Sequence, residues 1–295
     1  MPELPEVETV ARQLAPMVRE RRLRRVRILD QLLRSGRCPP YSGRLIANVF
    51  RFGKQVLFEL DRSERDDAVL YLAIHLRMTG RLLHVDRRPR CRSHLRAVLE
   101  LDRGAVLFID PRRFGTLRWL RTPEQAAPGA IEPLGPCFTA ERLAEELGRS
   151  RPPIKPWLLR QDRLVGLGNI YASEILHEAR LSPLRATNTL RPAEITRLHR
   201  ATRAVLERAI EHCGTTFSDF QDARGVTGSY QRFLAVYGRE GEPCLRCAGP
   251  IVRLVQQQRS TFFCPRCVQT PRRHRKSGRP QKRSEPAAQT GSLCH

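Results

Sequence analysis

The spacing of apolar side chains changes along the chain, and each change predicts a different kind of structure. Residues 5–14 carry apolar side chains at helical intervals, namely Val7, Val10, Ala11 and Leu14. A helix is therefore predicted almost at the N-terminus. From about 23 to 120 the apolar residues fall into short runs typical of strands, namely VRILD, QVLFELD, AVLYLAIHL, HLRAVLEL and AVLFID. Asp102-Arg103-Gly104 would form a turn between the last two, so the pattern predicts an antiparallel sandwich or barrel.

The second half of the chain has a helical period. The stretch 122–136, TPEQAAPGAIEPLGP, is rich in Pro and Gly and is interpreted as a linker. After it, apolar residues at helical spacing predict a helical domain up to about residue 216, with the segments TAERLAEELG, PWLLRQ, NIYASEILHEA and PAEITRLHRATRAVLERAIEHC. A polar loop follows. The segment 269–295 has almost no apolar content, and we interpret it as a disordered basic tail.

The charge balance points to a polyanionic partner. The chain has 295 residues with 53 Lys and Arg against 30 Asp and Glu, a net charge of +23. Cations that neutralise phosphates release condensed counterions, so nucleic acid is the favoured partner and a membrane surface the competing one. The longest apolar run, AVLYLAI, is far too short to span a bilayer, and no secretory signal precedes it. We therefore expect an intracellular protein.

Four of the nine cysteines form a metal-binding pattern. Cys244 and Cys247 are separated by two residues, as are Cys264 and Cys267, with sixteen residues between the pairs. This spacing lets two turns present four thiolates to one tetrahedral Zn²⁺, with a hairpin between them. A four-thiolate site has no open coordination position, so the zinc is expected to be structural. The remaining cysteines are interpreted as ordinary small residues, at positions Cys38, Cys91, Cys137, Cys213 and Cys294.

The opening stretch, MPELPEVETV, has two interpretations. Removal of Met1 would leave Pro2 with a free secondary amine, which at neutral pH is unprotonated far more often than a lysine side chain. Such an amine can attack a sugar carbon, with Glu3 and Glu6 as acid and base partners beside it. Alternatively, the stretch is simply a capped entry into the first helix, where Pro and Glu are common.

Several motifs, taken in their order along the chain, favour the interpretation of Pro2 as a nucleophile. MPELPEVETV, DPRRFG, VGLGNIYASEIL and a four-cysteine finger with QRSTFFCPRC resemble the formamidopyrimidine-DNA glycosylases over about residues 2–268. These bifunctional base-excision repair enzymes remove oxidised purines such as 8-oxoguanine from damaged double-stranded DNA. The resemblance implies an α+β multidomain protein that acts as a cytoplasmic, nucleoid-associated monomer without a membrane partner. Its expected parts are an N-terminal helix plus antiparallel β-sandwich domain (1–121), a linker (122–136), a helix-two-turns-helix domain (137–236), a zinc finger (237–268) and the tail (269–295).

The resemblance also implies roles for the catalytic residues. Pro2 matches the Schiff-base nucleophile that attacks the deoxyribose C1′. Glu3 matches the acid that protonates the sugar ring oxygen, and Glu6 a supporting carboxylate. Lys54, in RFGKQVLFEL, matches the lysine that contacts phosphate and assists β-elimination, and Arg259 matches the finger arginine of phosphate binding and δ-elimination.

A lesion inside a duplex must be flipped out, and apolar wedges commonly hold the kinked duplex open. Met78, in HLRMTG, and Arg112 and Phe114, in DPRRFG, match the intercalating triad of the family. Both apolar members lie near glycine in turn-like segments, which favours exposure over core packing. These three residues are therefore expected at the DNA surface.

Further DNA contacts are expected in the second half of the chain. Asn169 follows the glycines of VGLG at a helix start, where free main-chain N–H groups would favour phosphate. His94, Arg151 and Lys155 match other DNA-contacting positions. The loop 215–230 corresponds to the segment that closes over the flipped base.

Three departures from the family pattern limit this transfer. The loop has GSYQ where an aromatic pair is more usual, the finger has QQQRST where Gly or Ala usually precedes QRST, and the tail is longer. The nearest alternative is an endonuclease VIII-like enzyme for oxidised pyrimidines, although Leu4 replaces the glycine common there. A remote alternative is a non-enzymatic zinc-finger DNA-binding protein, which would not need Pro2, Glu3 and Lys54 together.

Overall fold

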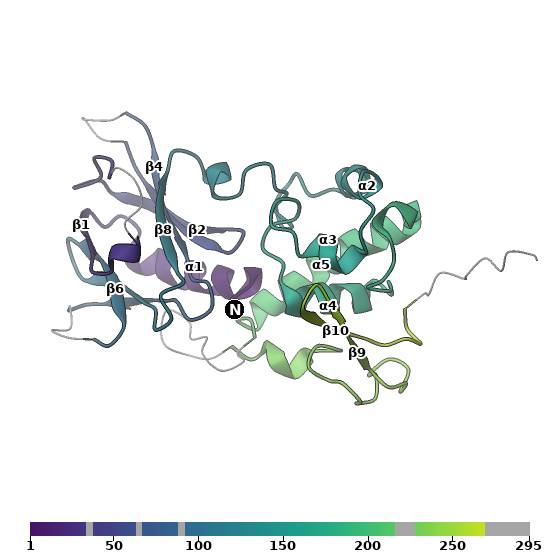
Figure 1. Ribbon diagram of the computed structural model, residues 1–295. Helices are drawn as coiled ribbons and strands as arrows, with labels where there is room; N and C mark the ends of the chain where they lie inside the picture. The colour runs from purple at the N-terminus through teal and green to yellow at the C-terminus, as the bar shows by residue number, and fades with distance from the viewer. Residues whose placement is uncertain (34–37, 63–66, 88–91, 216–227, 269–295) are drawn as a thin grey trace, which may run out of the picture.

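The computed structural model describes residues 1–33, 38–62, 67–87, 92–215 and 228–268. Within them, eight strands form two four-stranded antiparallel sheets, which lie with the first helix at one side of the molecule, while the later helices and the finger lie at the other (Figure 1). One sheet has the order β1 (Leu23–Ile28), β6 (Leu95–Leu101), β7 (Ala105–Ile109), β5 (Arg81–Val85). The other has the order β2 (Ile46–Phe52), β3 (Gln55–Leu60), β4 (Leu70–His75), β8 (Thr116–Leu120).

The two sheets share one hydrophobic core, so the expected sandwich is confirmed. Val56 and Phe58 of β3 pack in the same cluster as Leu99 of β6 and Val106 of β7. The expected turn is also present, because β6 and β7 are paired and Gly104 between them has φ +73°. The apolar pattern did not single out β2, β5 and β8. In β2 a register shift near Ile46 interrupts the two-residue alternation on which such recognition depends.

Helix α1 (Leu4–Val18) contributes to two separate cores. It begins where the sequence predicts a helix and continues past residue 14 to Val18. Val7, Val10 and Leu14 are buried in the sandwich core. Leu4, one turn earlier, is buried in the core of the helical domain, and its main-chain N–H donates to the Gly166 carbonyl at 3.0 Å. The first helix therefore joins the two domains.

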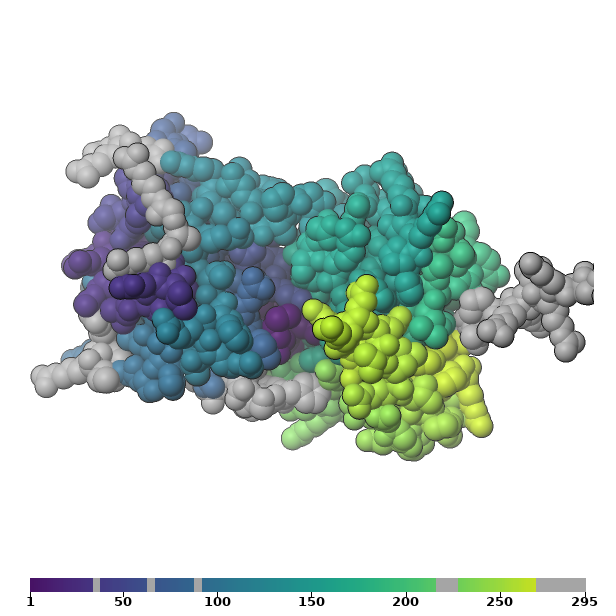
Figure 2. Space-filling view, in the orientation of Figure 1, coloured from purple at the N-terminus to yellow at the C-terminus, as the bar shows by residue number. Residues whose placement is uncertain are grey.

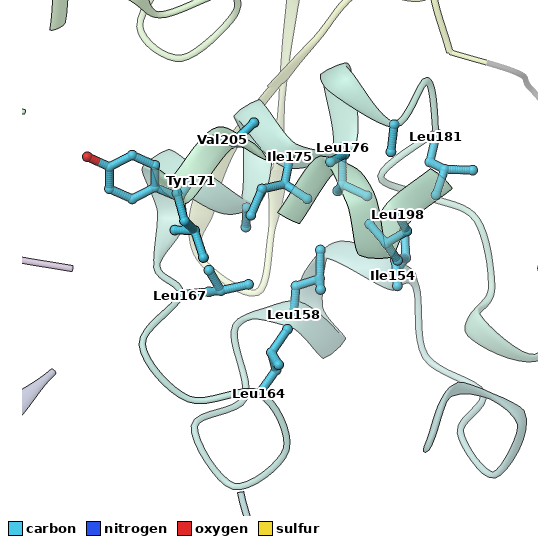
Figure 3. Packing of buried hydrophobic residues seen from close by; sticks show 14 of the residues in the cluster. Ile154, Leu158, Leu164, Leu167, Tyr171, Ile175, Leu176, Leu181, Leu198 and Val205 are labelled. Atoms are coloured by element: carbon cyan, nitrogen blue, oxygen red, sulfur yellow. The ribbon is translucent and has the colours of Figure 1, made fainter. Parts of the chain in front are cut away.

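The helical domain surrounds a core of large aliphatic and aromatic side chains. Its helices are α2 (Ala140–Gly148), α3 (Ile154–Leu158), α4 (Asn169–Glu178) and α5 (Pro192–Glu211). Figure 3 shows Tyr171 and Ile175 of α4 in the same cluster as Leu158 of α3 and Leu198 of α5, and all four are buried. Short 3₁₀ turns also occur, at η1 (Gln31–Leu33), η2 (Pro123–Ala126), η3 (Thr187–Thr189) and η4 (Tyr230–Phe233).

The Pro/Gly-rich segment 122–136 is fixed to both domains. Ile131 is buried in the helical core, and Glu132 accepts a hydrogen bond from the Gly53 N–H at 2.9 Å. Glu132 also pairs with the buried Arg51 guanidinium at 2.8 Å, which Glu8 of α1 contacts from the other side at 2.9 Å. Buried contacts with both domains therefore fix this segment, although its composition is that of a linker.

The zinc-finger segment contains the expected hairpin. β9 (Val252–Gln256) and β10 (Arg259–Phe263) are antiparallel, and Gln257 and Gln258 form the two-residue turn between them. Both glutamines have positive φ, 45° and 60°, a conformation that usually favours Asn or Gly in such a turn.

Two expectations lie outside the described residues, namely most of the loop 215–230 and the tail 269–295. Among the helices of the described ranges, none combines the length and apolar composition needed to cross a bilayer.

Candidate active site

The N-terminal residues lie at the junction of the two domains, and Figure 2 shows them at the surface between the sheet part and the finger. Met1 is 49 % exposed, whereas Pro2 is buried. The Glu3 N–H, directly after Pro2, donates to the Glu6 carboxylate at 2.8 Å. This contact fixes the main chain that carries Pro2.

The carboxylate of Glu3 occupies the N-terminus of α4. It accepts hydrogen bonds from the main-chain N–H groups of Gly168 at 2.7 Å, Ile170 at 3.0 Å and Tyr171 at 3.3 Å. A Cβ at position 168 would lie 2.4 Å from the Glu3 carboxyl, so the close approach requires glycine. Burial raises the pKa of Glu3 above its ordinary value, although these hydrogen bonds and Lys54 act in the opposite direction.

This arrangement corrects the expectation of free N–H groups around Asn169, whose own DNA contact stays a prediction. The sequence suggested that the N–H groups at the start of α4 are free for phosphate, but they are used by a carboxylate from the other domain. The start of α4 therefore does bind an anion, but this anion is the protein's own Glu3 carboxylate. The side chain of Asn169 is itself held in place, since its Nδ2 donates to the Ser260 carbonyl at 2.9 Å.

The carboxylate of Glu6 connects three segments. Its Oε1 accepts hydrogen bonds from the Tyr171 hydroxyl at 2.6 Å and from the main chain and hydroxyl of Thr215 at 2.7 and 2.9 Å. Burial and the neighbouring Glu6 charge raise the pKa of Tyr171 well above its usual value, so the phenol remains a donor. Glu6 thus links α1 to α4 and to the first residue of the loop 215–230.

Lys54 lies in a buried, cationic environment at the β2–β3 turn. Burial lowers the pKa of Lys54 to about 8; the Glu3 carboxylate opposes this shift, and the Arg259 cation adds to it. A cavity of about 340 Å³ adjoins the ammonium, and its lining includes His75, Arg77 and Arg118. Burial, followed by the Arg77 cation, lowers the pKa of His75 to about 3. Sequence reasoning missed these three residues because single basic residues in or beside strands carry no motif.

Lys155, expected as a DNA contact, is buried inside the protein. It has no exposed surface, and its ammonium donates to Asn169 Oδ1 at 2.6 Å, to the Ser260 carbonyl at 3.0 Å and to Thr261 Oγ1 at 2.8 Å. All three protons are therefore used within the protein. Lys155 therefore positions Asn169 and strand β10, where the exposed Arg259 is the first residue, and its expected DNA contact stays a prediction.

The three residues expected as a wedge are exposed. Met78 is 43 % and Phe114 49 % exposed, although both are large apolar side chains. The Arg112 guanidinium lies over the Phe114 ring, 4.9 Å from its centroid. This cation–π contact pre-orients two of the three side chains toward solvent.

Two buried aspartates, missed in the sequence, hold the turn that carries Arg112 and Phe114. Asp110 accepts from the Gly115 N–H at 2.7 Å, from the Arg112 N–H at 3.2 Å and from the Thr79 hydroxyl, which follows Met78. Asp30 receives the Arg113 guanidinium at 2.7 and 2.8 Å, and this pair lowers the pKa of Asp30 to about 2. An Asp at the start of a Pro-containing turn is the signal that could have identified Asp110.

Of the other expected DNA contacts, His94 and Arg151 are exposed. His94 precedes β6 with φ +61°, and its carbonyl accepts from the Asp110 N–H at 3.0 Å. It therefore lies next to the turn that bears Arg112. Arg151 lies before α3, at the other side of the domain junction.

The four paired cysteines converge on one point. Their sulfur atoms all lie within 4.8 Å of one another, with Cys247 and Cys264 at 3.4 Å and Cys244 and Cys267 at 3.6 Å. This set fits one tetrahedral Zn²⁺, and a zinc ion there stabilises the finger without an open position for chemistry. Cys38, Cys137 and Cys213 are exposed and lie outside this cluster.

Comparison with known proteins agrees with this architecture. Family models match for the Formamidopyrimidine-DNA glycosylase N-terminal domain over residues 1–117, the Formamidopyrimidine-DNA glycosylase H2TH domain over 130–221 and the zinc finger found in FPG and IleRS over 241–270. The formamidopyrimidine-DNA glycosylases of Pelotomaculum thermopropionicum and Herpetosiphon aurantiacus are each 42 % identical over 280 residues, covering 90 % of this chain and 99 % of the relative.

Solved structures show the same similarity. The MutM (FPG) protein from Thermus thermophilus is 40 % identical with a TM-score of 0.75, covering 90 % of this chain and 98 % of that one. A Lactococcus lactis FPG mutant in complex with Fapy-dG-containing DNA is 31 % identical with a TM-score of 0.78, covering 91 % and 100 %. Fold and site thus define a zinc-containing DNA glycosylase with a helix-two-turns-helix domain. The chain belongs to the formamidopyrimidine-DNA glycosylase family.

The role of Lys155 can be separated from DNA contact by two substitutions. Lys155→Met keeps most of the volume but leaves buried acceptors of Asn169 and Thr261 without a donor, so we expect a loss of about 1–3 kcal/mol in the free energy of unfolding. The matched Arg151→Met changes an exposed side chain and should stay within about 0.5 kcal/mol. Denaturant unfolding of both variants measures this, and equal stabilities would contradict the positioning role.

The coupling of Glu3 to Lys54 predicts a pKa change. Because the Glu3 charge favours the ammonium form, Glu3→Gln should lower the pKa of Lys54 below about 8. An NMR titration of the Lys54 side chain measures the shift, with Glu20→Gln, an exposed position beyond α1, as control. An unchanged or higher pKa in Glu3→Gln would show that the two groups do not interact.

Proposed function

We propose that the protein excises oxidised purines, such as 8-oxoguanine and formamidopyrimidines, from duplex DNA and then nicks the abasic site by β,δ-elimination. The observation that carries this proposal is the site at the domain junction. There the residue after Met1 is held by the buried Glu3–Glu6 contact, and Lys54 with a pKa of about 8 is electrostatically coupled to Glu3. The names of the relatives, and the Fapy-dG DNA in one solved structure, support the same substrate class.

The first chemical step would use the α-amino group of Pro2 after removal of Met1. An α-amino group titrates near pH 8, so a substantial fraction is an unprotonated nucleophile at neutral pH. Its nitrogen attacks C1′, the bond from C1′ to the base breaks, and the sugar ring opens to an iminium. Glu3 supplies the proton to the ring oxygen, and its raised pKa favours the protonated form needed for that step.

The strand would then be cut by two eliminations. The iminium acidifies the C2′–H, so loss of that proton expels the 3′ phosphate, and a second elimination expels the 5′ phosphate. Lys54 and Arg259 are the cations that would neutralise the departing phosphates, and the Arg259 charge acts on Lys54 strongly enough to help lower its pKa. The Lys54 ammonium form predominates below about pH 8 and decreases above it.

Access to the lesion would depend on the exposed triad of Met78, Arg112 and Phe114. Inserting apolar side chains into the base stack offsets the few kcal/mol lost when a base is flipped out. Arg112 would face the orphaned base, since it is held at the same turn as Phe114. The side chains of His94, Arg151 and Asn169 would contact the backbone on either side. We further infer a cytoplasmic, nucleoid-associated monomer without membrane contact.

Oxidised pyrimidines are the second candidate substrate. A solved complex of wild-type Lactococcus lactis FPG contains an oxidised pyrimidine, so membership of this family does not restrict the substrate to purines. Leu4, which distinguishes the PELPEVE form, is fully buried in the helical core and so cannot contact a base directly. Cleavage assays on duplexes with single oxidised bases distinguish the candidates: faster turnover of 8-oxoguanine than of oxidised pyrimidines supports the proposal, and the reverse order contradicts it.

Borohydride trapping tests the nucleophile. Reduction of the iminium should give a stable covalent complex with abasic or 8-oxoguanine DNA, and Pro2→Gly should largely abolish it. Pro16→Ala, in the exposed last turn of α1, is the matched proline control and should trap normally. DNA binding without trapping by the wild type would refute the enzyme mechanism. Intact Met1 on fully active protein, measured by mass spectrometry, would refute the role of Pro2.

The salt dependence of binding tests the phosphate contacts. If six phosphates are neutralised, log K should fall with log salt with a slope of about −5. Fluorescence anisotropy with a labelled abasic duplex measures the slope. Arg151→Met should make the slope shallower by about one phosphate. A flat response of the wild type would contradict binding dominated by phosphate.

A further inference from the structure

His177 lies in the last turn of α4 and is buried against the cysteine cluster. Its Nε2 is 4.0 Å from Cys244 Sγ, and its Nδ1 is buried without a hydrogen-bond partner among the described residues. We propose that His177 is an outer-sphere hydrogen-bond donor to the zinc-bound thiolate of Cys244 and connects the zinc centre to α4.

The chemistry of a zinc-bound thiolate fixes the direction of this contact. A coordinated cysteine has lost its proton and can only accept, so the hydrogen must belong to His177 Nε2. The neutral ring carries one proton, and Nδ1 has no acceptor among the described residues that would compete for it. Partners of metal ligands orient those ligands and tune the metal, and their loss typically weakens metal binding 10- to 100-fold.

The cysteine turn holds the main chain of the same residue. The Arg246 N–H donates to Cys244 Sγ at 3.4 Å, and its guanidinium donates to the His177 carbonyl at 3.0 Å and to Glu178 at 3.3 Å. A cation at the C-terminal carbonyls of a helix also complements the helix dipole. Ring and main chain of His177 therefore both contact the turn that carries the first two zinc ligands.

The other residues of α4 extend this connection toward the active site. Glu174, one turn before His177, accepts the main-chain N–H groups of residues 235–237 at 2.8–2.9 Å, just before the finger begins. The N-terminus of the same helix holds the Glu3 carboxylate. The ten-residue helix α4 thus contacts the zinc ligand Cys244 near its C-terminus and the Glu3 carboxylate at its N-terminus.

Two substitutions separate hydrogen bonding from packing in the full-length protein. His177→Phe fills the ring volume without a donor, and His177→Gln retains an amide N–H near the place of Nε2. We expect His177→Phe to bind zinc about 10-fold more weakly or worse in chelator competition, and His177→Gln to stay close to the wild type. His199→Phe is the matched control, because His199 lies on α5 against Phe138 and away from the cysteines.

Spectroscopy adds readouts that a merely structural role would not change. In the Co²⁺-substituted protein, loss of the donor should make the thiolate more electron-rich and move the sulfur-to-cobalt charge-transfer band to lower energy in His177→Phe only. In the wild-type zinc protein, nitrogen NMR shifts should identify the Nε2-protonated tautomer.

Three results would each overturn the proposal, and none of them uses DNA or turnover, so the proposed function would be unaffected. The first is wild-type zinc affinity with an unshifted band in His177→Phe. The second is equal loss of zinc in His177→Gln and His177→Phe, which would leave only packing. The third is the Nδ1-protonated tautomer in the wild type. This measurement needs no variant, so it tests the proposal even if a variant does not fold.

Discussion

The carboxylate of Glu3 is the interaction on which the active site depends. Its main chain belongs to the sheet domain, while its oxygen atoms are bound by three N–H groups at the start of α4 in the helical domain. A buried carboxylate without such donors would be strongly unfavourable, so the two domains must meet with little freedom at this point. The adjacent Pro2 and the coupled Lys54 are positioned as a consequence. Gly168 is small because any side chain there would displace this carboxylate.

In the protein without bound DNA, the cationic groups around Lys54 are not fully neutralised by anions. Burial is the main cause that lowers the pKa of His75 and of Lys54, and neighbouring cations add to it: Arg77 and Lys54 act on His75, and Arg259 acts on Lys54. These cations therefore disfavour one another's charged forms. A DNA phosphate placed among them would relieve this repulsion and raise these pKa values again. Binding energy and the protonation state of the site are thus linked by the same charges. The overall charge of +23 extends the attraction beyond the site itself.

Much of the architecture could be predicted from apolar spacing, whereas the direction of individual polar groups could not. The first helix, the β6–β7 turn and the finger hairpin follow from local patterns of few residues. The fate of the N–H groups at the start of α4 depends on Glu3, 165 residues away from Gly168 in the chain. Likewise, the burial of Lys155 depends on Thr261, 106 residues later in the chain, whose hydroxyl oxygen accepts a hydrogen bond from the Lys155 ammonium. Motifs identify such residues, but only the fold decides their partners.

The long sequence separations within the site have a consequence for biosynthesis. Glu6 is among the first residues to leave the ribosome, yet its partner Thr215 follows 209 residues later. The sheet domain can therefore bury most of α1 while the acidic start of that helix still lacks its donors. The site at the domain junction is completed only when α4, Thr215 and the finger residue Arg259 have emerged and folded. Nascent fragments that lack these segments therefore cannot form the Glu3 and Glu6 contacts of the finished molecule.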